Sequence, residues 1–269
     1  MSNLELNDQI VPFKDFYGAN HKEMPKLIAE GRVPLLSAGL MQERLNSLGT
    51  STQDAWWNNY FDTGDGIFYH PEGSAKIVLG AQIIKDLTPN SPLSNGAIVL
   101  GDSIDESIAV YKSLDAVEEF SKKDIENLKL RSVLSPEEAK NHPVWIALAG
   151  GDKILLNNYV DETFRLGKEQ YSKEKMMDVY FGSAQKKAVG RLWCVGSLGY
   201  GSSASGNYSV DGRSGGRFVG VAPEALGARG NTPSISTITN NVHAYLKNTD
   251  VVEGATKKGI TKAIQDSYK

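Results

Sequence analysis

Three glycines in one short segment are spaced closely enough to suggest a phosphate-binding loop. Gly199 and Gly201 flank a single residue, and Gly206 follows five positions later. A loop that cradles phosphate needs Gly-x-x-x-x-Gly-Lys-Ser/Thr, or Gly-x-Gly-x-x-Gly running into a helix. Neither pattern is present, and the apolar run from Phe218 to Val221 is typical of a strand. The glycine spacing therefore does not favour nucleotide binding.

Acidic residues between positions 62 and 72 are the best candidates for binding a cation. Asp62, Asp65 and Glu72 alternate with glycine, as ligands do in calcium loops. The fuller Asp-x-Asn/Asp-x-Asn/Asp-Gly spacing is missing, so a plain turn at 62–66 is favoured. Cys194 is the only cysteine, which excludes an intrachain disulfide and a cysteine-based zinc cluster. We predict no metal and no cofactor.

Histidines and arginines offer no clear catalytic group. His70 and His142 each precede a proline, and no Gly-x-Ser-x-Gly motif supplies a nucleophile for them. Structural histidines are therefore favoured. Arg213 and Arg217 could bind an anion, but a pair of loop arginines is more often solvated surface.

The elements that would position these residues mix helix and strand in the first half of the chain. Apolar runs at 76–80 and 97–101 are expected to form short strands. Trp56 and Trp57 are expected to be buried, because such large aromatic side chains usually are. Ser37 is predicted to cap a helix with apolar residues at helical spacing, namely Leu40, Met41, Leu45 and Leu48.

The middle of the chain is predicted to be helical. Ser135 and Glu138 form a capping box around Pro136. Asp152 is expected to cap a longer helix, with helical sequence continuing from Lys168 to Asp178 and a last helix at 253–267. The apolar residues that support the longer helix are Leu155, Tyr159, Val160 and Phe164.

Composition limits the classes of protein that the chain can be. It has 269 residues, 40% of them hydrophobic, and a formal net charge of −3. That charge argues against nucleic acid as the main partner. No apolar run approaches the ~18 residues of a membrane span, and the N-terminus has no signal-peptide pattern. We expect a soluble protein that is made in the cytoplasm. Its final location is left open and includes a virion or the cell surface.

One segment departs from this ordinary composition. From Gly196 to Gly216, seven glycines and six serines fill 13 of 21 positions. Strand-like sequence brackets the segment on both sides, and it carries Tyr200 and Tyr208, which flexible linkers seldom do. Between Cys194 and Gly216 there is no Lys, Glu, Gln, Met or Trp. Tyrosine with serine, glycine and asparagine is the composition of a binding loop.

The sequence from Arg191 to Val221, RLWCVGSLGYGSSASGNYSVDGRSGGRFVGV, resembles the variable region of diversity-generating retroelement target proteins. It is also similar to the end of the formylglycine-generating-enzyme type of C-type lectin fold. In that retroelement family, template adenines are mutagenised, mostly in asparagine codons. Changing the first two bases of such a codon cannot give any of the five missing residue types. The resemblance implies an α+β, C-type-lectin-like fold with small antiparallel sheets, flanking helices and irregular loops.

The resemblance also implies an organisation for the chain. One domain would span 1–269, with a helical insertion at about 103–178, a variable region at 191–221 and an extension at 222–269. Alternation in an extended segment would place Tyr200, Ser202, Ala204 and Gly206 on one face and the ligand-facing residues on the other. The expected ligand-facing residues are Gly199, Gly201, Ser203, Ser205, Asn207, Tyr208, Ser209, Asp211, Gly212, Arg213 and Ser214. The expected framework residues are Trp193, Val195, Val210, Phe218, Val219 and Val221.

The leading hypothesis is thus a non-enzymatic protein that binds a protein or cell-surface ligand through a hypervariable face. Sugar binding through calcium is not favoured, because the Glu-Pro-Asn and Trp-Asn-Asp signatures of that lectin class are missing. An enzyme of the formylglycine-generating type is disfavoured, because the aerobic enzymes use a pair of cysteines. An α/β hydrolase or nucleotide-binding enzyme with an unrecognised site remains the alternative.

Overall fold

The computed structural model describes residues 4–6, 12–129, 133–211 and 215–223. All of them belong to a compact unit, Met1–Ala225, which is distinct from the unit Leu226–Lys269. The predicted last helix at 253–267 and most of the proposed extension lie outside the described residues.

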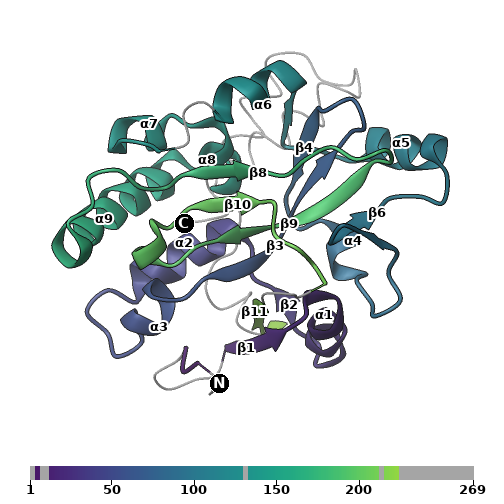
Figure 1. Ribbon diagram of the computed structural model, residues 1–269. Coiled ribbons are helices and arrows are strands. Elements are labelled where there is room, and N and C mark those ends of the chain that lie inside the picture. Colours follow the sequence, from purple (N-terminus) through teal and green to yellow (C-terminus); the bar gives the residue numbers. More distant parts are fainter. Residues whose placement is uncertain (1–3, 7–11, 130–132, 212–214, 224–269) are drawn as a thin grey trace, which may run out of the picture. The chain divides into compact units, whose positions relative to one another are not determined.

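Two long antiparallel strands, β3 (Phe61–Tyr69) and β9 (Val189–Val195), form the centre of an 11-stranded sheet (Figure 1). The main path of the sheet runs in the order β1-β11-β3-β9-β10-β8. Two pairings, β10 with β8 and β11 with β3, are parallel. The expected small antiparallel sheets are therefore joined into one mixed sheet. The remaining strands are β1 (Phe13–Gly18), β2 (Val33–Pro34), β4 (Ala75–Val78), β5 (Leu93–Ser94), β6 (Ala97–Val99), β7 (Glu118–Phe120), β8 (Val179–Phe181), β10 (Ala204–Gly206) and β11 (Gly216–Val221).

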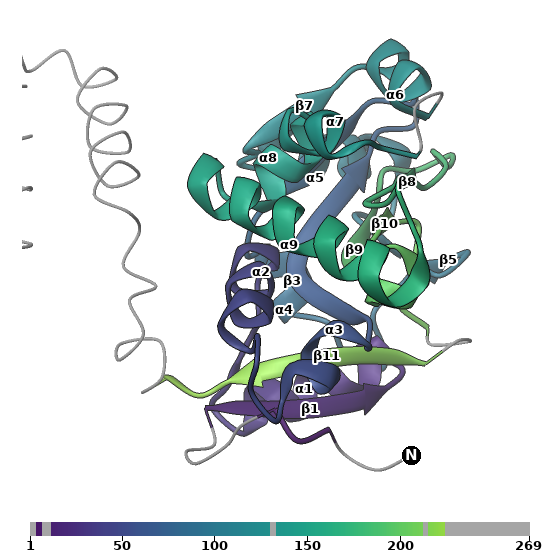
Figure 2. The ribbon, with the colours of Figure 1, turned by 90° about the vertical axis from the view of Figure 1, so that its left-hand side faces the viewer.

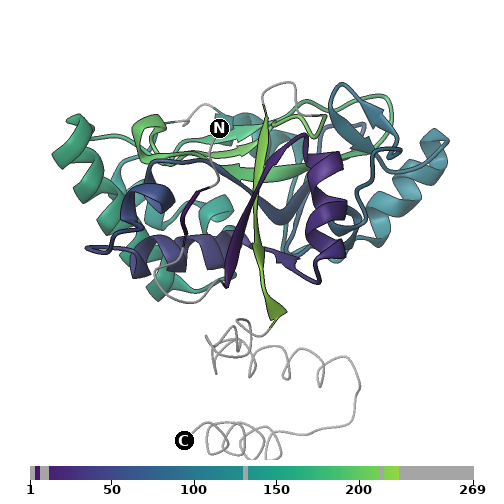
Figure 3. The same cartoon turned by 90° about the horizontal axis from the view of Figure 1, so that it is seen from below.

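Helices cover this sheet, and most of them lie between β6 and β8 in the sequence. Figure 2 shows α2 and α9 side by side on the same side of β3 and β9. Figure 3 shows β1 and β11 running alongside each other, in the antiparallel register that pairs Phe16 with Phe218. The helices are α1 (Asn20–Ala29), α2 (Ser37–Asn46), α3 (Gln53–Trp57), α4 (Gln82–Lys85), α5 (Ile104–Ser113), α6 (Lys122–Lys129), α7 (Pro136–Lys140), α8 (Pro143–Leu148) and α9 (Lys153–Tyr171), with a 3-10 turn, η1 (Leu198–Tyr200).

Several local predictions are confirmed by the hydrogen bonds at helix ends. Ser135 and Glu138 form both bonds of the capping box at α7. The Asp152 carboxylate accepts the N–H groups of Ile154 and Leu155 at the start of α9. The predicted continuation of helix from Lys168 to Asp178 is wrong beyond Tyr171. Ser172 adopts a left-handed conformation (φ 54°) there and ends the helix.

The expected turn at 62–66 and the expected cap at Ser37 are both wrong for one reason. Residues 62–66 belong to the buried strand β3, and the register against β9 shifts between Asp62 and Gly66. Asp65 is fully buried, and its carboxylate accepts the N–H groups of Ser37 and Gly80 at 2.7 and 2.9 Å. Ser37 is the first residue of the helix and not its cap, and its hydroxyl donates to the Thr63 hydroxyl at 3.2 Å.

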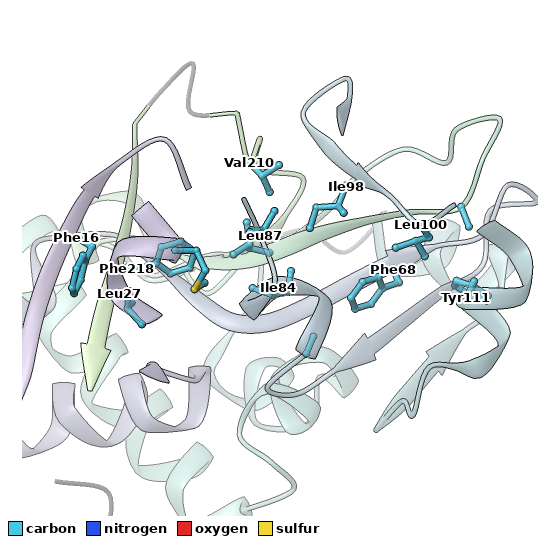
Figure 4. Packing of buried hydrophobic residues seen from close by; sticks show 14 residues of the cluster. Phe16, Leu27, Phe68, Ile84, Leu87, Ile98, Leu100, Tyr111, Val210 and Phe218 are labelled. Atoms are coloured by element: carbon cyan, nitrogen blue, oxygen red, sulfur yellow. The ribbon is translucent and has the colours of Figure 1, made fainter. Parts of the chain in front are cut away.

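The hydrophobic core confirms the expected framework. Phe218 and Val210 pack in one buried cluster with Phe16, Leu27 and Phe68, as Figure 4 shows. Trp56 and Trp57 are each 1% exposed, as expected for core aromatics. The other framework residues, Trp193, Val195, Val219 and Val221, are also buried.

Candidate ligand-binding face

The glycine- and serine-rich segment runs from the end of β9 through η1 and β10 to the start of β11. Among the expected ligand-facing residues, Asn207 is exposed. Partly exposed residues are Gly199, Ser205, Tyr208, Ser209 and Asp211. Gly212, Arg213 and Ser214 lie outside the described residues.

The predicted alternation of faces holds only within β10. The chain before it is a 3-10 turn that ends at Gly201 and Ser202, both with positive φ (79° and 49°). This turn directs Tyr200 into solvent, where it is 85% exposed, instead of placing it with the buried residues Ser202, Ala204 and Gly206. Gly201 and Ser203 are buried, contrary to expectation, and the Ser203 hydroxyl donates to the Tyr200 carbonyl at 3.1 Å.

Side chains from outside the segment hold its main chain. Arg44, fully buried in α2, donates to the Gly196 carbonyl at 2.9 Å. Lys173 donates to the Gly199 carbonyl at 2.6 Å, and the hydroxyl of Tyr69 in β3 donates to the Gly206 carbonyl at 2.9 Å. Each bond fixes the path of the segment without using one of its side chains.

Arg191 in β9 is the main anchor for the second half of the segment. Its guanidinium donates to the carbonyls of Asn207 and Tyr208 at 3.2 and 3.0 Å. The same group donates to the carbonyls of Asn95 and Gly96 at 2.7 and 3.3 Å, in the turn between β5 and β6. Arg191 therefore ties the segment to a neighbouring hairpin.

Two further main-chain positions of the segment are also held from outside. The His21 ring donates from Nδ1 to the Val210 carbonyl at 3.0 Å. The Tyr60 hydroxyl donates to the Gly215 carbonyl at 2.9 Å, and its ring stacks on Tyr208 with 6.3 Å between centroids.

Sequence reasoning missed these anchors, although two of them leave a signal. Arg44 and Arg191 are charged residues at apolar positions, one on the buried side of a helix and one inside an apolar strand. A charged side chain at such a position needs polar partners, and here the partners are carbonyls. Arg217, expected on the solvated surface, is instead 5% exposed and lies 5.0 Å over the Tyr17 ring.

Two neighbouring strands of the sheet contribute a buried polar cluster near the segment. Asp62 and Cys194 are register partners in β3 and β9, and both are at most 2% exposed. One Asp62 carboxylate oxygen accepts a hydrogen bond from the main-chain N–H of Arg217 at 2.8 Å. Burial raises the pKa of Asp62 to about 6, against the lowering effect of hydrogen bonds from Arg217, Asn20 and Cys194. Burial likewise raises the pKa of the Cys194 thiol, so it stays protonated and unreactive.

Asp62→Asn is expected to remove a pH dependence of stability. A carboxyl whose pKa is raised on folding stabilises the protein fully below its unfolded pKa, and that contribution is lost as the pH rises through the folded value. Raising the pH from 4 to 7 should therefore cost the natural protein about 2 kcal/mol more than the variant. Urea denaturation at both pH values measures the difference, and equal losses in the two proteins would contradict it.

The other candidate chemical groups that the structure describes do not assemble into a catalytic site. His70 lies in an open polar cavity of about 510 Å³ with Ser74, Lys76 and Tyr111. Its Nδ1 accepts the Glu72 N–H, whereas the Ser74 hydroxyl bonds to Tyr111, so the base and the nucleophile are not paired. His142 is buried and caps α8. Within the described ranges, no group of three or more His, Cys, Asp or Glu side chains could hold a metal ion.

Comparisons with known proteins bear on the fold. No family model matches the chain, and no curated protein matches it significantly. One solved structure is described as the accommodation of massive sequence variation in Nanoarchaeota by the C-type lectin fold. The two chains are 21% identical with a TM-score of 0.58, and the match covers 81% of this chain and 100% of the other. This protein therefore has the C-type lectin fold.

Proposed function

We propose that this chain is a binding protein whose 194–216 segment is a ligand-binding face diversified by a retroelement. One observation carries the proposal: Arg44, Lys173, Tyr69 and Arg191, which lie outside the segment, donate hydrogen bonds to its main-chain carbonyls. These carbonyls belong to Gly196, Gly199, Gly206, Asn207 and Tyr208. Carbonyl groups are the same in every residue type. Replacing an exposed side chain therefore leaves these anchors in place.

Such anchoring separates the two tasks of the segment. The buried anchors and the sheet beneath fix where each residue lies, while the outward side chains are free to change. Ser205 and Asn207 illustrate the second group, since within the described residues their side chains bond only to each other, at 2.7 Å. The solved structure of the same fold is described in terms of massive sequence variation, which supports this assignment.

The proposed ligand is a protein or another cell-surface molecule. The proposed contacts are the accessible residues Gly199, Tyr200, Ser205, Asn207, Tyr208, Ser209 and Asp211. Nucleic acid is not proposed, because the chain has no net positive charge. No helix in the described part of the chain has the length and apolar character to cross a bilayer.

Sequencing the DNA around the gene tests the diversification. We expect a near-copy of the stretch that encodes residues 191–221, differing from it at adenines and lying beside a reverse transcriptase gene. Copies of the gene from different isolates should then differ at the codons for Ser205 and Asn207 and agree at those for Trp193 and Phe218. A locus without such a copy, together with invariant codons in the segment, would contradict the proposal.

A further inference from the structure

Tyrosine side chains are distributed unevenly over the described residues. Tyr69, Tyr111 and Tyr159 are buried. The other six described tyrosines all belong to the 194–216 segment or contact it, and four of them come from elsewhere in the chain. These four, which we call the constant tyrosines, are Tyr17, Tyr60, Tyr171 and Tyr180.

Two of the constant tyrosines border the end of the segment. Tyr60 stacks on Tyr208 and donates to the Gly215 carbonyl. Burial, with a smaller contribution from the interaction with Tyr17, raises the pKa of Tyr60, so its phenol stays neutral. Tyr17 is 38% exposed, and the Arg217 guanidinium lies over its ring.

The other two border the beginning and the middle. The Tyr171 ring lies about 3.5 Å from where a side chain at Gly199 would begin, and its hydroxyl donates to Asn58. Tyr180 in β8 is the register partner of Ser205 in β10, and its hydroxyl donates to Asp178 at 3.0 Å. Each of these two tyrosines is 42% exposed.

Three of the described charged groups between these tyrosines have partners. Lys173 is bonded to the Gly199 carbonyl, Asp178 accepts from Tyr180, and Asp211 accepts from Ser209. Two further charged residues, Glu174 and Lys175, are exposed and carry opposite charges. The other accessible groups of the described segment are phenol rings, amides and hydroxyls. Protein–protein contact surfaces have this composition, whereas phosphate-rich partners need unpaired Lys and Arg.

We propose that the constant tyrosines are a permanent part of the binding face and that its partner is the neutral surface of a folded protein. The inference rests on the proposed function. Tyrosine supplies a large contact area with few rotatable bonds, so it contributes affinity in many different complexes. The constant tyrosines would then supply contacts shared by all variants, while the exposed side chains of the segment select the partner.

A selection experiment tests the proposal with myoglobin, a folded protein of near-zero net charge at pH 7, as the probe. The whole chain is displayed on phage with positions Tyr200, Ser205, Asn207 and Tyr208 randomised, and binders to immobilised myoglobin are isolated. In each binder, Tyr171→Ser and Tyr180→Ser are expected to raise the Kd about tenfold or more when combined. The melting temperature should stay nearly constant, because both side chains are substantially exposed.

Ile154→Ser is the matched control. Ile154 is 75% exposed and lies 17 residues before Tyr171 in α9, about 26 Å along the helix axis, so its loss should leave the Kd unchanged. If the Kd of the binders does not change when both tyrosines are substituted, the inference is overturned and the proposed function still stands. A library that yields stable proteins but no binder would count against the proposed function itself.

Discussion

Arg44→Met is expected to lower the free energy of unfolding by about 5 kcal/mol. The Arg44 guanidinium is fully buried and donates to the carbonyls of Trp56, Asn59 and Gly196 and to the Tyr159 hydroxyl, at 2.7 to 3.0 Å. Methionine fills a similar volume but leaves these buried acceptors without donors. Each unsatisfied acceptor costs about 1–3 kcal/mol.

Chemical denaturation followed by tryptophan fluorescence measures this loss. Arg165→Met is the matched control, because Arg165 pairs with Glu162 and Glu169 on the exposed side of α9. Its loss should cost about 1 kcal/mol or less. Similar losses in the two variants would show that Arg44 does not anchor the start of the segment.

Arg191→Met is expected to cost about 4 kcal/mol and to loosen one part of the segment selectively. Four carbonyls, two in the segment and two in the β5–β6 turn, lose their donor. The amide of Val210, which donates to the Gly96 carbonyl at 2.9 Å, should then exchange with solvent much faster.

Hydrogen exchange distinguishes this local effect from general destabilisation. The amide of Gly196 donates to the Ser203 carbonyl in the other half of the segment, which Arg44 and Lys173 hold. Protection at Gly196 should therefore fall less than at Val210. Equal acceleration at both amides would mean that Arg191 supports the fold as a whole and has no special role in the segment.

The parts of the fold that short-range chemistry determines were predictable from the sequence. The capping box at Ser135 and the cap at Asp152 follow from residue type and spacing, and the buried framework at Trp193 and Phe218 follows from the family resemblance. The strand at Asp62 was mistaken for a turn, because its aspartates and glycines resemble turn sequence. Long-range hydrogen bonds, including those from Arg217, Ser37 and Gly80, satisfy these aspartates inside the sheet.

The detail of the candidate face was not predictable from the sequence. Composition and resemblance placed the face in the 194–216 segment, and β10 shows the expected alternation, with Ser205 outward and Gly206 inward. The positive φ angles at Gly201 and Ser202 break that alternation and expose Tyr200. The anchors and the constant tyrosines come from five or more separate elements, so no local pattern could bring them together.

The most direct test of the account is the stability of one triple variant, Tyr200→Ser with Ser205→Asn and Asn207→Tyr. All three side chains point outward, and the anchors hold only the main chain. The free energy of unfolding should therefore change by less than about 1 kcal/mol. Gly206→Ala in the same strand is the control. Its new Cβ would lie 2.9 Å from the Ile67 side chain and 3.2 Å from Trp193, so it should cost about 2 kcal/mol or more.

The account predicts that the triple variant unfolds like the natural protein while the single Gly206→Ala variant does not. A loss of about 3 kcal/mol or more in the triple variant would contradict it, because the outward side chains would then be determining the structure of the segment.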